Sequence, residues 1–588
     1  MLDLVGQLMY YPYMASIVGK KRGNQTYYYL VESARVNGKP RIVSQEYLGN
    51  TAEVMDRLSG AAPGRPERTQ HKAFGDLAAV WGILDRLGVA GAIDDVCGSR
   101  RSDAGASVGT YLALATANRV VAPCSKLGFE QWWATTAGPR FAKVPVAVTD
   151  HRRFWDAMDN LDTAKLAAAE AKIAATMTAE FGLDLSGLAL DMTNFATFID
   201  SANEAAPIAK RGHAKQKRND LRLVGLALVV TRDGAIPLTS HPYPGNRPDV
   251  TQFGAVLDEL TTRYGALFDT HGDAGPADKD KAPSGPTVVF DAGQNSAANF
   301  AHLAETGLHY VGSLTPSSFP DLLAVPARRR HPVDPDTYPG LSAYDTRAMV
   351  FGIDRRVVLT HSANLHTKQC AGFEQTLAKT TRELGELAAT LARGKTRRLP
   401  DAVQAEVVRI TRPRWVSRVL TTQLTGTTPA TMHLTWQIDP AARKALETEI
   451  FGKRLLVTDH DHWTTAEVVA GYRSQNDVES GFRQLKDPHV VGFSPMFHWT
   501  ESKIRVHVFY CVLALAVAHL MRRQAHQSGL DLSVRQLLTN LAGIQETVLL
   551  YPTGNKGRPR AQRILTDTNT TQAQLFELFE LDKYAPRR

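Results

Sequence analysis

The sequence contains little cysteine and no hydrophobic run long enough to cross a membrane. Its cysteines, Cys97, Cys124, Cys370 and Cys511, lie far apart without a CxxC pair, which argues against a zinc ribbon or a disulfide framework. The longest apolar run, 508–518, is shorter than the roughly 20 residues that span a bilayer, so we expect a buried helix there. The opening residues lack the pattern of a secretory signal. These absences predict a cytoplasmic protein without a membrane segment.

Charge of one sign is only slightly in excess. The 68 Lys and Arg residues outnumber the 59 Asp and Glu residues, giving a net charge of +9. This balance favours a polyanionic partner, with nucleic acid ahead of an anionic membrane. A hydrophobic content of 43% and a charged content of 22% over 588 residues are typical of a soluble globular protein with two to four domains.

The first third of the chain predicts a small hairpin followed by a helical region. Residues 26–49 form two Tyr- and Val-rich runs on either side of Asn37-Gly38, a strong hairpin signal within an N-terminal arm at 1–60. Its aromatic and basic side chains are suited to holding DNA, and equally to packing on the next domain. The stretch 70–182 has helical periodicity and fits either a DNA-binding domain or a scaffold.

The segment 183–314 changes to strand periodicity and carries two isolated acids. Asp191 lies among apolar residues in a strand-like run, and Asp291 ends a short buried-type strand before Ala-Gly. An acid at the carboxyl end of a buried strand is a common place for chemistry, whereas a strand-end or turn residue is the structural alternative for both. Between them, a basic loop containing His213 and Lys215 precedes a hairpin centred on an Asp-Gly turn at 233–234.

The remaining sequence divides into three parts. Residues 315–455 differ in pattern from the preceding segment, because strand-like pieces surround a charged helix. We interpret them as a β-rich insertion rather than a continuation of the sheet. Residues 456–530 return to a strand and two helices. Residues 531–588 are interpreted as a C-terminal tail whose basic stretch is either solvated or in contact with DNA.

The predicted helix at 468–489 has an unusual polar stripe. Residues three and four apart share a helix face, and the shared face consists of Tyr472, Gln475, Glu479, Phe482 and Lys486. A packing face would consist of aliphatic residues, and a carboxylate is seldom buried unless it is paired or metal-bound. Taken alone, the stripe also fits a solvated helix face.

Taken together, these features resemble the DDE transposases of bacterial insertion sequences. The order of elements is three strands, a helix, a strand with the second acid, a helix, a strand, an insertion and the helix with the third acid. The pattern Tyr472-x2-Gln475-x3-Glu479-x6-Lys486 is similar to the Y-x2-R-x3-E-x6-K signature of the IS-four superfamily, in the subgroup with an N-terminal hairpin. The resemblance implies an α/β fold with an RNase H-like catalytic core, preceded by the hairpin arm and the helical domain.

The resemblance also implies an activity and a site. Asp191, Asp291 and Glu479 would hold two Mg²⁺ or Mn²⁺ ions, because hard cations prefer oxygen ligands and a metal pair activates water and clamps phosphate. Further residues would contact DNA, namely Tyr472, Gln475, Arg483, Lys486, His213 and Lys215. The protein would cut the terminal inverted repeats of an insertion sequence and join them to target DNA. Its partners would be double-stranded DNA and, in the synaptic complex, a second copy of the chain.

One position departs from the signature. Gln475 stands where the superfamily has arginine, which removes a cation expected to touch phosphate. Arg483, four residues after Glu479, lies on the same side of the helix. Two other functions stay open: a DNA-binding protein that has kept the fold and lost catalysis, which Gln475 supports, and a plain RNase H-like nuclease or resolvase, which the insertion and the polar stripe disfavour.

Overall fold

The computed structural model contains two compact units. It describes residues 14–23, 25–36, 39–58, 65–98, 105–214, 218, 220–269, 285–394, 398–428, 430–551 and 560–587. Unit 1 comprises residues 1–72, 546–566 and 586–588, and unit 2 comprises 73–545 and 567–585. At the level of class, the chain is a mixed α/β protein with one large mixed sheet in unit 2.

Unit 1 begins with a three-stranded antiparallel sheet. Its elements are β1 (Met14–Arg22), β2 (Gln25–Val36), β3 (Lys39–Asn50) and α1 (Thr51–Leu58). The predicted hairpin is confirmed, because Val36 pairs with Lys39 across the turn, although Asn37 and Gly38 lie outside the described residues. Tyr29 and Tyr47 make an edge contact at 5.3 Å between ring centroids, and the Lys20 ammonium lies 4.9 Å from the Tyr29 ring.

The predicted C-terminal tail is wrong, because most of it is folded. In unit 1, β16 (Gln545–Tyr551) pairs on one side with β17 (Arg560–Leu565) and on the other with β4 (Arg68–Ala73). In unit 2, α19 (Val534–Ala542) and α20 (Thr570–Leu578) have capping boxes and pack against each other. Apolar residues of these elements, such as Leu541 and Leu575, are fully buried. The basic stretch at 552–559 lies outside the described residues.

The first part of unit 2 is helical, as the periodicity predicts. Its helices are α2 (Gly75–Arg86), α3 (Val89–Cys97), α4 (Val108–Val121), α5 (Lys126–Ala134), α6 (Gly138–Phe141), α7 (His151–Met158) and α8 (Thr163–Phe181). Side chains of Ser107, Ser125, Asp150 and Asp162 accept backbone N–H bonds at helix starts, which satisfies donors that the helix itself leaves unpaired.

The helix α18 (Glu501–Gln527) is the centre around which this helical part packs. It contacts α2, α4, α8, α17 and β7. Its length and composition would suffice to cross a membrane, but 94% of its most apolar 18-residue window is buried inside the protein. The expectation of a buried core helix for 508–518 is therefore confirmed.

Two cations are buried between the helical part and α18. The Lys126 ammonium donates to the Tyr510 hydroxyl at 3.3 Å and lies 4.4 Å from that ring. The Arg119 guanidinium donates to the carbonyls of Gly492 and Cys124. Through Gly492, Arg119 also fixes the segment 487–500, which precedes α18. The same segment is held by His507 of α18, which bonds to the carbonyl of the next residue.

This burial predicts a pH-dependent stability. Burial, reinforced by Arg119, lowers the pKa of Lys126 to about 7, whereas the unfolded chain releases this proton near about 10.4. Between these values the unfolded state binds the extra proton, so the free energy of unfolding rises with pH from about 7 to about 10. Lys126→Met removes the buried charge. We expect its thermal midpoint to exceed that of the wild type at pH 6 and the difference to shrink by pH 10.

Scanning calorimetry across this pH range measures the effect. The control is Lys379→Met, because Lys379 is exposed on another helix and is expected to leave the pH profile unchanged. A constant difference between Lys126→Met and the wild type from pH 6 to pH 10 would contradict the prediction.

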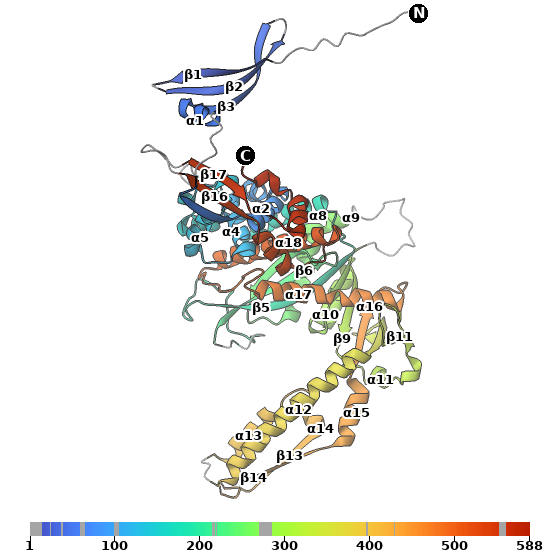
Figure 1. The fold of residues 1–588 in the computed structure, drawn as a ribbon. Coiled ribbons are helices and arrows are strands. Elements are labelled where there is room, and N and C mark those ends of the chain that lie inside the picture. The colour runs from blue at the N-terminus through green and yellow to red at the C-terminus, as the bar shows by residue number, and fades with distance from the viewer. Residues whose placement is uncertain are drawn as a thin grey trace, which may run out of the picture. The chain divides into compact units, whose positions relative to one another are not determined.

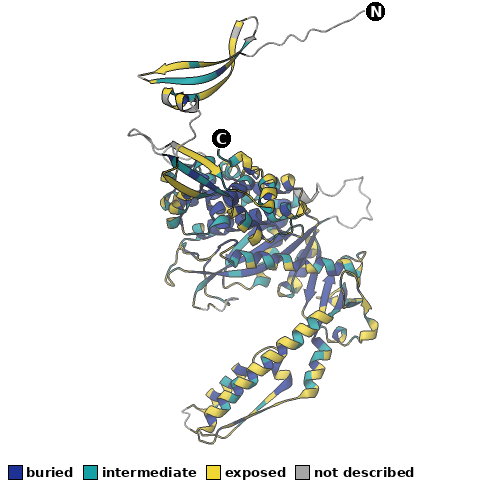
Figure 2. Cartoon of the chain, viewed as in Figure 1, coloured by how far each residue is buried: buried dark blue, intermediate teal, exposed yellow. Residues whose placement is uncertain are grey.

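The core of unit 2 is a nine-stranded sheet with the order β10-β11-β12-β15-β9-β8-β5-β6-β7. Its central strands are β5 (Gly187–Thr197), β6 (Arg222–Thr231), β7 (Pro237–Pro244), β8 (Thr287–Phe290) and β9 (His309–Leu314). β5, β6 and β7 are antiparallel, whereas β8 pairs parallel with β5 and β9 parallel with β8. These strands are buried along most of their length (Figure 2), which explains their near-continuous apolar sequence.

Helices cover both faces of this sheet. Phe290 of β8 packs against Phe253 of α9 (Phe253–Asp269) and Phe300 of α10 (Ala297–Glu305) on one face. The preceding residue, Val289, faces the other side and packs against α16 (Thr465–Arg473). On that second face, α17 (Gln475–Lys486) lies across β5 and β6 (Figure 1).

The predicted insertion is wrong in two respects. First, its strands continue the sheet: β10 (His331–Pro332), β11 (Leu341–Val350) and β12 (Ile353–Ser362) join it through β15 (Lys453–Thr458). Burial falls towards the edge of the sheet: β12 has a continuous buried run, β11 buries only Leu341, Ala343 and Val350, and β10 is exposed.

Second, the rest of the insertion is mainly helical. We call residues 363–450 the arm. It consists of α12 (Ala363–Ala392), α13 (Pro400–Thr411), α14 (Val416–Val419), β13 (Leu420–Thr425), β14 (His433–Ile438) and α15 (Pro440–Ile450). The β-branched residues of 405–419 suggested strands, but Val403, Val407 and Ile410 form a helical stripe in a separate hydrophobic cluster of the arm. Tertiary packing overrides the strand propensity there.

Candidate active site

The two aspartates lie on neighbouring parallel strands. Asp191 is within β5, and Asp291 directly follows β8. Ala189 pairs with Val289 in the parallel register. β8 ends at Phe290, and this register continued by two residues would set Asp291 beside Asp191, because neighbouring strands lie only about 4.8 Å apart. Acids one hundred positions apart in the sequence are therefore brought to neighbouring strands of one sheet.

Both aspartates are on the face covered by α16 and α17. Val289, two residues before Asp291, packs against α16, and Asp291 itself has an extended backbone. Thr193, two residues after Asp191, accepts a hydrogen bond of 2.8 Å from the Lys486 ammonium of α17. Because side chains of a strand alternate between faces, each aspartate shares the face of the residue two positions away. Asp291 also accepts a hydrogen bond from the N–H of Gly293, which agrees with the structural alternative of a turn residue.

The predicted single helix at 468–489 is two helices. α16 ends at Arg473, α17 begins at Gln475, and Ser474 lies between them. The hydroxyl and the N–H of Ser474 both bond to the carbonyl of Gly471, which tightens the last turn of α16. The helical stripe that periodicity predicts is therefore interrupted after its first member.

Tyr472, that first member, does not share the face of the later ones. Its ring packs against the cluster of β9, β12, β15 and α16. The Arg454 guanidinium lies 5.6 Å from the ring centroid. The prediction that Tyr472 contacts DNA beside Glu479 is thus not supported, because Tyr472 belongs to the helix before the break.

Gln475 is buried, which corrects its predicted role as a DNA contact. Its side chain is 5% exposed, and its amide Nε2 donates to the carbonyl of Leu190 at 3.0 Å. Its Oε1 atom is buried without a hydrogen-bond partner. Leu190 is the residue before Asp191, so Gln475 fixes the start of α17 against the strand that carries the first acid.

We expect Gln475→Ala to destabilise the protein without weakening DNA binding. Loss of one buried hydrogen bond lowers the free energy of unfolding by about 1–2 kcal/mol. Part of this loss is offset, because the substitution also removes the buried Oε1 atom that has no hydrogen-bond partner. The midpoint of urea denaturation and the affinity for DNA in a mobility-shift assay measure the two effects. A drop in affinity beyond about threefold, without destabilisation, would instead indicate a direct phosphate contact.

Lys486 is held over β5 at the other end of α17. Besides its bond to Thr193, its ammonium lies 5.2 Å from the centroid of the Phe195 ring. Phe195 in turn stacks on Phe493 at 3.9 Å, and both rings are buried. The cation is therefore positioned by a hydroxyl and by an aromatic face, while its side chain keeps partial access to solvent.

Glu479 lies between these two attachment points. Gln475 contacts β5 at Leu190 and Lys486 contacts it at Thr193, so the middle of α17 passes over the part of β5 that carries Asp191. Glu479 is four residues after Gln475, on the same side of the helix. Glu479 and Arg483 are both exposed, which leaves their side chains accessible to a ligand.

Oxygen ligands are the only metal-binding atoms that these three acids offer. Within the described residues, two other groups have all their ligand atoms within 4.8 Å of one another, namely His309, Asp459 and His460, and His366, Cys370 and Glu447. Asp191, Asp291 and Glu479 do not form so tight a group. Their carboxylate oxygens are of the type that hard cations such as Mg²⁺ prefer.

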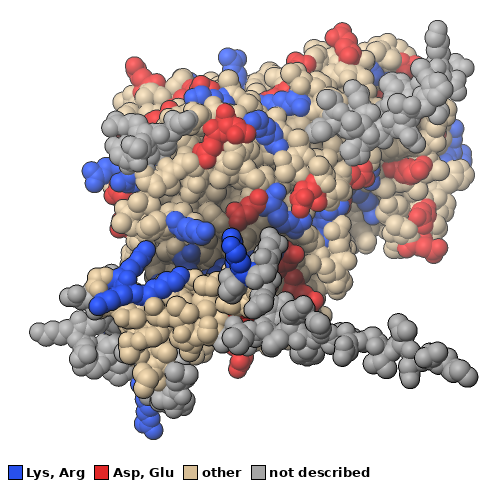
Figure 3. Space-filling view, turned by 90° about the horizontal axis from the view of Figure 1, so that it is seen from above, with Lys and Arg blue, Asp and Glu red and all other residues tan. Residues whose placement is uncertain are grey.

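Of the two predicted residues of the basic loop, the structure describes only His213. His213 is exposed, and its backbone carbonyl accepts a hydrogen bond from Asn194 of β5. Lys215 lies outside the described residues. On the face drawn in Figure 3, Lys and Arg side chains form several groups among scattered Asp and Glu, so positive charge is available to a polyanion without covering the surface.

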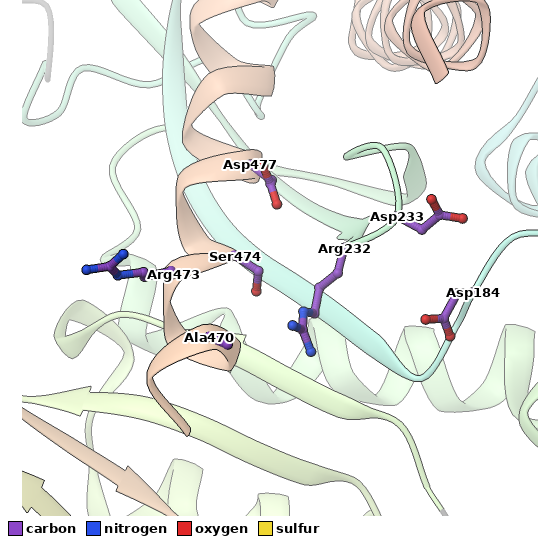
Figure 4. A pocket seen from close by; sticks show the side chains of 7 residues that line it. All are labelled: Asp184, Arg232, Asp233, Ala470, Arg473, Ser474 and Asp477. Carbon is purple, nitrogen blue, oxygen red and sulfur yellow. The ribbon is translucent and has the colours of Figure 1, made fainter. Parts of the chain in front are cut away.

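A polar pocket of about 500 Å³ lies at the break between α16 and α17 (Figure 4). It is lined by Asp184, Arg232, Asp233, Ala470, Arg473, Ser474 and Asp477. Burial raises the pKa of Asp477, and Arg522 and Arg232 oppose that shift. Because its acids and arginines largely compensate one another, the pocket has no clear preference for an anion or a cation. None of the three predicted catalytic acids lines it.

Sequence reasoning missed Thr193, Phe195 and Phe493. The first two follow Asp191 at spacings of two and four, so strand alternation would have placed them on the same face as the acid. Phe493 had no such signal, because its contact depends on how the irregular segment before α18 folds back on β5.

Comparison with known proteins found a distant structural similarity that can be described beside this geometry. No family model matches the chain, and no curated protein matches it. Among solved structures, it is similar to the cryo-EM structure of a piggyBac transposase synaptic complex with hairpin DNA. The match has a TM-score of 0.36 and 9% sequence identity, and it covers 81% of this chain and 82% of the other. A similarity of this size does not establish a shared fold.

Proposed function

We propose that the protein is a DDE transposase that cuts the ends of an insertion sequence and joins them to target DNA. The observation that supports the proposal is the parallel register of β5 and β8, which, continued by two residues, would set Asp291 beside Asp191 beneath the helix that carries Glu479. Two acids on the same face of neighbouring strands offer the oxygen ligands that hard divalent cations prefer.

The topology supports an RNase H-like core. Three antiparallel strands, β5 to β7, are followed by α9, by β8 parallel to β5, by α10 and by β9 parallel to β8. The acids occupy the first strand, the end of the fourth strand and a helix after the insertion. This is the element order that the resemblance to DDE transposases implies, and the structure adds the strand pairing that a sequence cannot specify.

The three acids would hold divalent cations, with Asp191 at the centre between Asp291 and Glu479. Bound Mg²⁺ or Mn²⁺ would lower the pKa of water and neutralise charge on the phosphate. Around them, Lys486 supplies a positioned point charge for a phosphate, and the exposed Arg483 offers a second one. Gln475, the departure from the superfamily signature, serves to attach α17 to β5.

In the proposed reaction, water attacks the phosphodiester at the element end and the bond between phosphorus and the 3′ oxygen breaks. The freed 3′-OH then attacks a phosphodiester of the target, forming one new ester bond and releasing one 3′-OH of the target strand. Two element ends must be processed together, so we expect two copies of the chain to act on DNA as a dimer. The tyrosine and lysine side chains of the N-terminal sheet are suited to binding the ends.

We expect Lys486→Met to slow cleavage about 10–100-fold, because one positioned charge on the phosphate is lost. It should also reduce the magnitude of the slope of log affinity against log salt concentration by about 1, the value expected for the loss of one phosphate contact. Single-turnover cleavage and salt-dependent binding measure the two effects. Lys379→Met on the arm is the matched control, and an equal effect of both variants would contradict a local role for Lys486.

The proposal is tested with the full chain, Mg²⁺ and a duplex that carries the inverted repeats flanking its gene. Cleavage at the repeat ends followed by joined products is the expected result. Cleavage without joining would indicate a nuclease or resolvase. Binding of the ends without cleavage, in Mg²⁺ and in Mn²⁺, would indicate a DNA-binding protein that has lost catalysis.

A further inference from the structure

We propose that the base of the arm contains a binding site for one Zn²⁺ ion, formed by His366, Cys370 and Glu447. Their ligand atoms all lie within 4.8 Å of one another. The site is separate from the three acids of the candidate active site and independent of the function proposed for them.

Two helices bring these ligands together. His366 and Cys370 are four residues apart on α12, so they share one face of that helix. Glu447 comes from α15, the helix that returns from the arm to the sheet. α12 begins directly after β12, and α15 ends shortly before β15, so the ligands connect the outgoing and the returning chain where both leave the sheet.

The distances fit a tetrahedral ion. His366 Nε2 lies 3.3 Å from Glu447 Oε1 and 4.0 Å from Cys370 Sγ, while His366 Nδ1 lies 3.8 Å from the same sulfur. Zinc bonds of about 2.0–2.1 Å to nitrogen or oxygen and about 2.3 Å to sulfur give tetrahedral edges of about 3.3 Å and about 3.6 Å. Small rotations of the thiol and the imidazole would complete this geometry, with water in the fourth position.

The surroundings orient and neutralise the ligand set. The Arg443 guanidinium donates to the other oxygen of Glu447 at 2.9 Å and to Glu374 at 2.9 Å. Hydrogen bonds of this kind fix a ligating carboxylate and turn its second oxygen toward the metal. A thiolate and a carboxylate balance the two charges of the ion, and Glu374 offsets the arginine. A thiolate also selects zinc over magnesium.

The other compact group of potential ligands does not support a metal in the same way. Asp459 accepts hydrogen bonds from His309 Nδ1 and from the N–H of Tyr310, and His460 Nε2 bonds to Thr287. The two imidazoles are stacked at 4.5 Å between centroids, so their in-plane lone pairs do not converge. Those side chains satisfy one another without an ion.

A zinc site at the base of the arm has a structural consequence. It would close the chain between Cys370 and Glu447 and hold α12 against α15, in addition to the hydrophobic cluster of the arm. Removal of the ion is expected to raise the susceptibility of residues 371–446 to proteolysis, while the rest of unit 2 keeps its resistance.

The test uses the full chain, Zn²⁺ alone and Co²⁺ alone as probes. Dialysed protein reloaded with zinc should contain about one ion per chain by elemental analysis, and cobalt should give tetrahedral visible absorption with a thiolate charge-transfer band. Cys370→Ser and Glu447→Gln should each weaken zinc binding by at least about 100-fold. Cys97→Ser, which changes another partly exposed cysteine, should bind like the wild type.

Circular dichroism establishes whether the variants are folded. If Cys370→Ser fails to fold, Glu447→Gln still tests the site, because glutamine has the size and shape of glutamate. Wild-type protein that binds no zinc in a chelator-buffered titration would overturn the proposal. So would a cobalt spectrum without the thiolate band, or undiminished binding in Glu447→Gln. DNA cleavage is not a readout here, so this test and that of the transposase function fail independently.

Discussion

Replacement of Asp191 by asparagine is expected to lower the rate of DNA-end cleavage by at least about a thousandfold, equivalent to about 4 kcal/mol of transition-state stabilisation. Asparagine keeps the size of the side chain but removes its charge and one ligand oxygen. Binding of end DNA should stay within about twofold, because the phosphate contacts come from cations elsewhere. Asp291→Asn and Glu479→Gln should behave alike, since each would remove one ligand of the same metal pair.

Single-turnover cleavage in Mg²⁺ and mobility shift on the same duplex measure the two quantities. The matched control is Asp477→Asn, because Asp477 lies on α17 with Glu479 but lines the polar pocket at the start of that helix. It should cleave at the wild-type rate. If Asp191→Asn keeps its activity, Asp191 is removed from the site and the transposase proposal loses its central residue.

Replacement of Phe493 by alanine is expected to cost about 3–5 kcal/mol of unfolding free energy, because a fully buried ring leaves a cavity. The cost should include the stack on Phe195 at 3.9 Å. Cleavage should fall as well, since the Phe195 ring beneath Lys486 loses the surface that supports it. Phe493→Leu, which fills most of the volume, should cost less than about 1.5 kcal/mol.

Phe497 provides the control for this prediction. It lies four residues further along the same segment and is 60% exposed, so Phe497→Ala should change stability by no more than about 0.5 kcal/mol. Urea denaturation and cleavage rates compare the three variants. Equal stability of Phe493→Ala and Phe497→Ala would show that the segment does not support β5.

Local pattern was sufficient for several elements. Alternation and turn residues predicted β5 to β8 and the N-terminal hairpin, and helical periodicity predicted the helices of 70–182 and the buried α18. It failed where tertiary packing outweighed propensity, as in α13, whose valines form a helical stripe in the core of the arm. It also failed at Ser474, where one side-chain hydrogen bond divides a helix that periodicity makes continuous.

The same limit applies to the roles of single residues. The spacing of Gln475 and Lys486 predicted two DNA contacts on one helix face. Both side chains turn towards β5, but Gln475 is buried against the backbone of that strand, whereas Lys486 bonds to the Thr193 hydroxyl and stays partly exposed. Spacing along a helix predicts which face a side chain lies on but not how deeply it is buried, because burial depends on the element packed against that face.

The sequence by itself determined the candidate residues: three isolated acids, a lysine on the helix of the third, and a net charge suited to a polyanion. Tertiary structure alone decided which of them are neighbours. The parallel pairing of β5 with β8 puts the strands of Asp191 and Asp291 side by side, and the fold of the arm brings Glu447 to a cysteine and a histidine whose sequence context indicated no metal. The physical reason is that proximity between distant residues depends on strand register and helix packing. Both depend on interactions along the whole chain, so the spacing of residues within one segment does not reveal them.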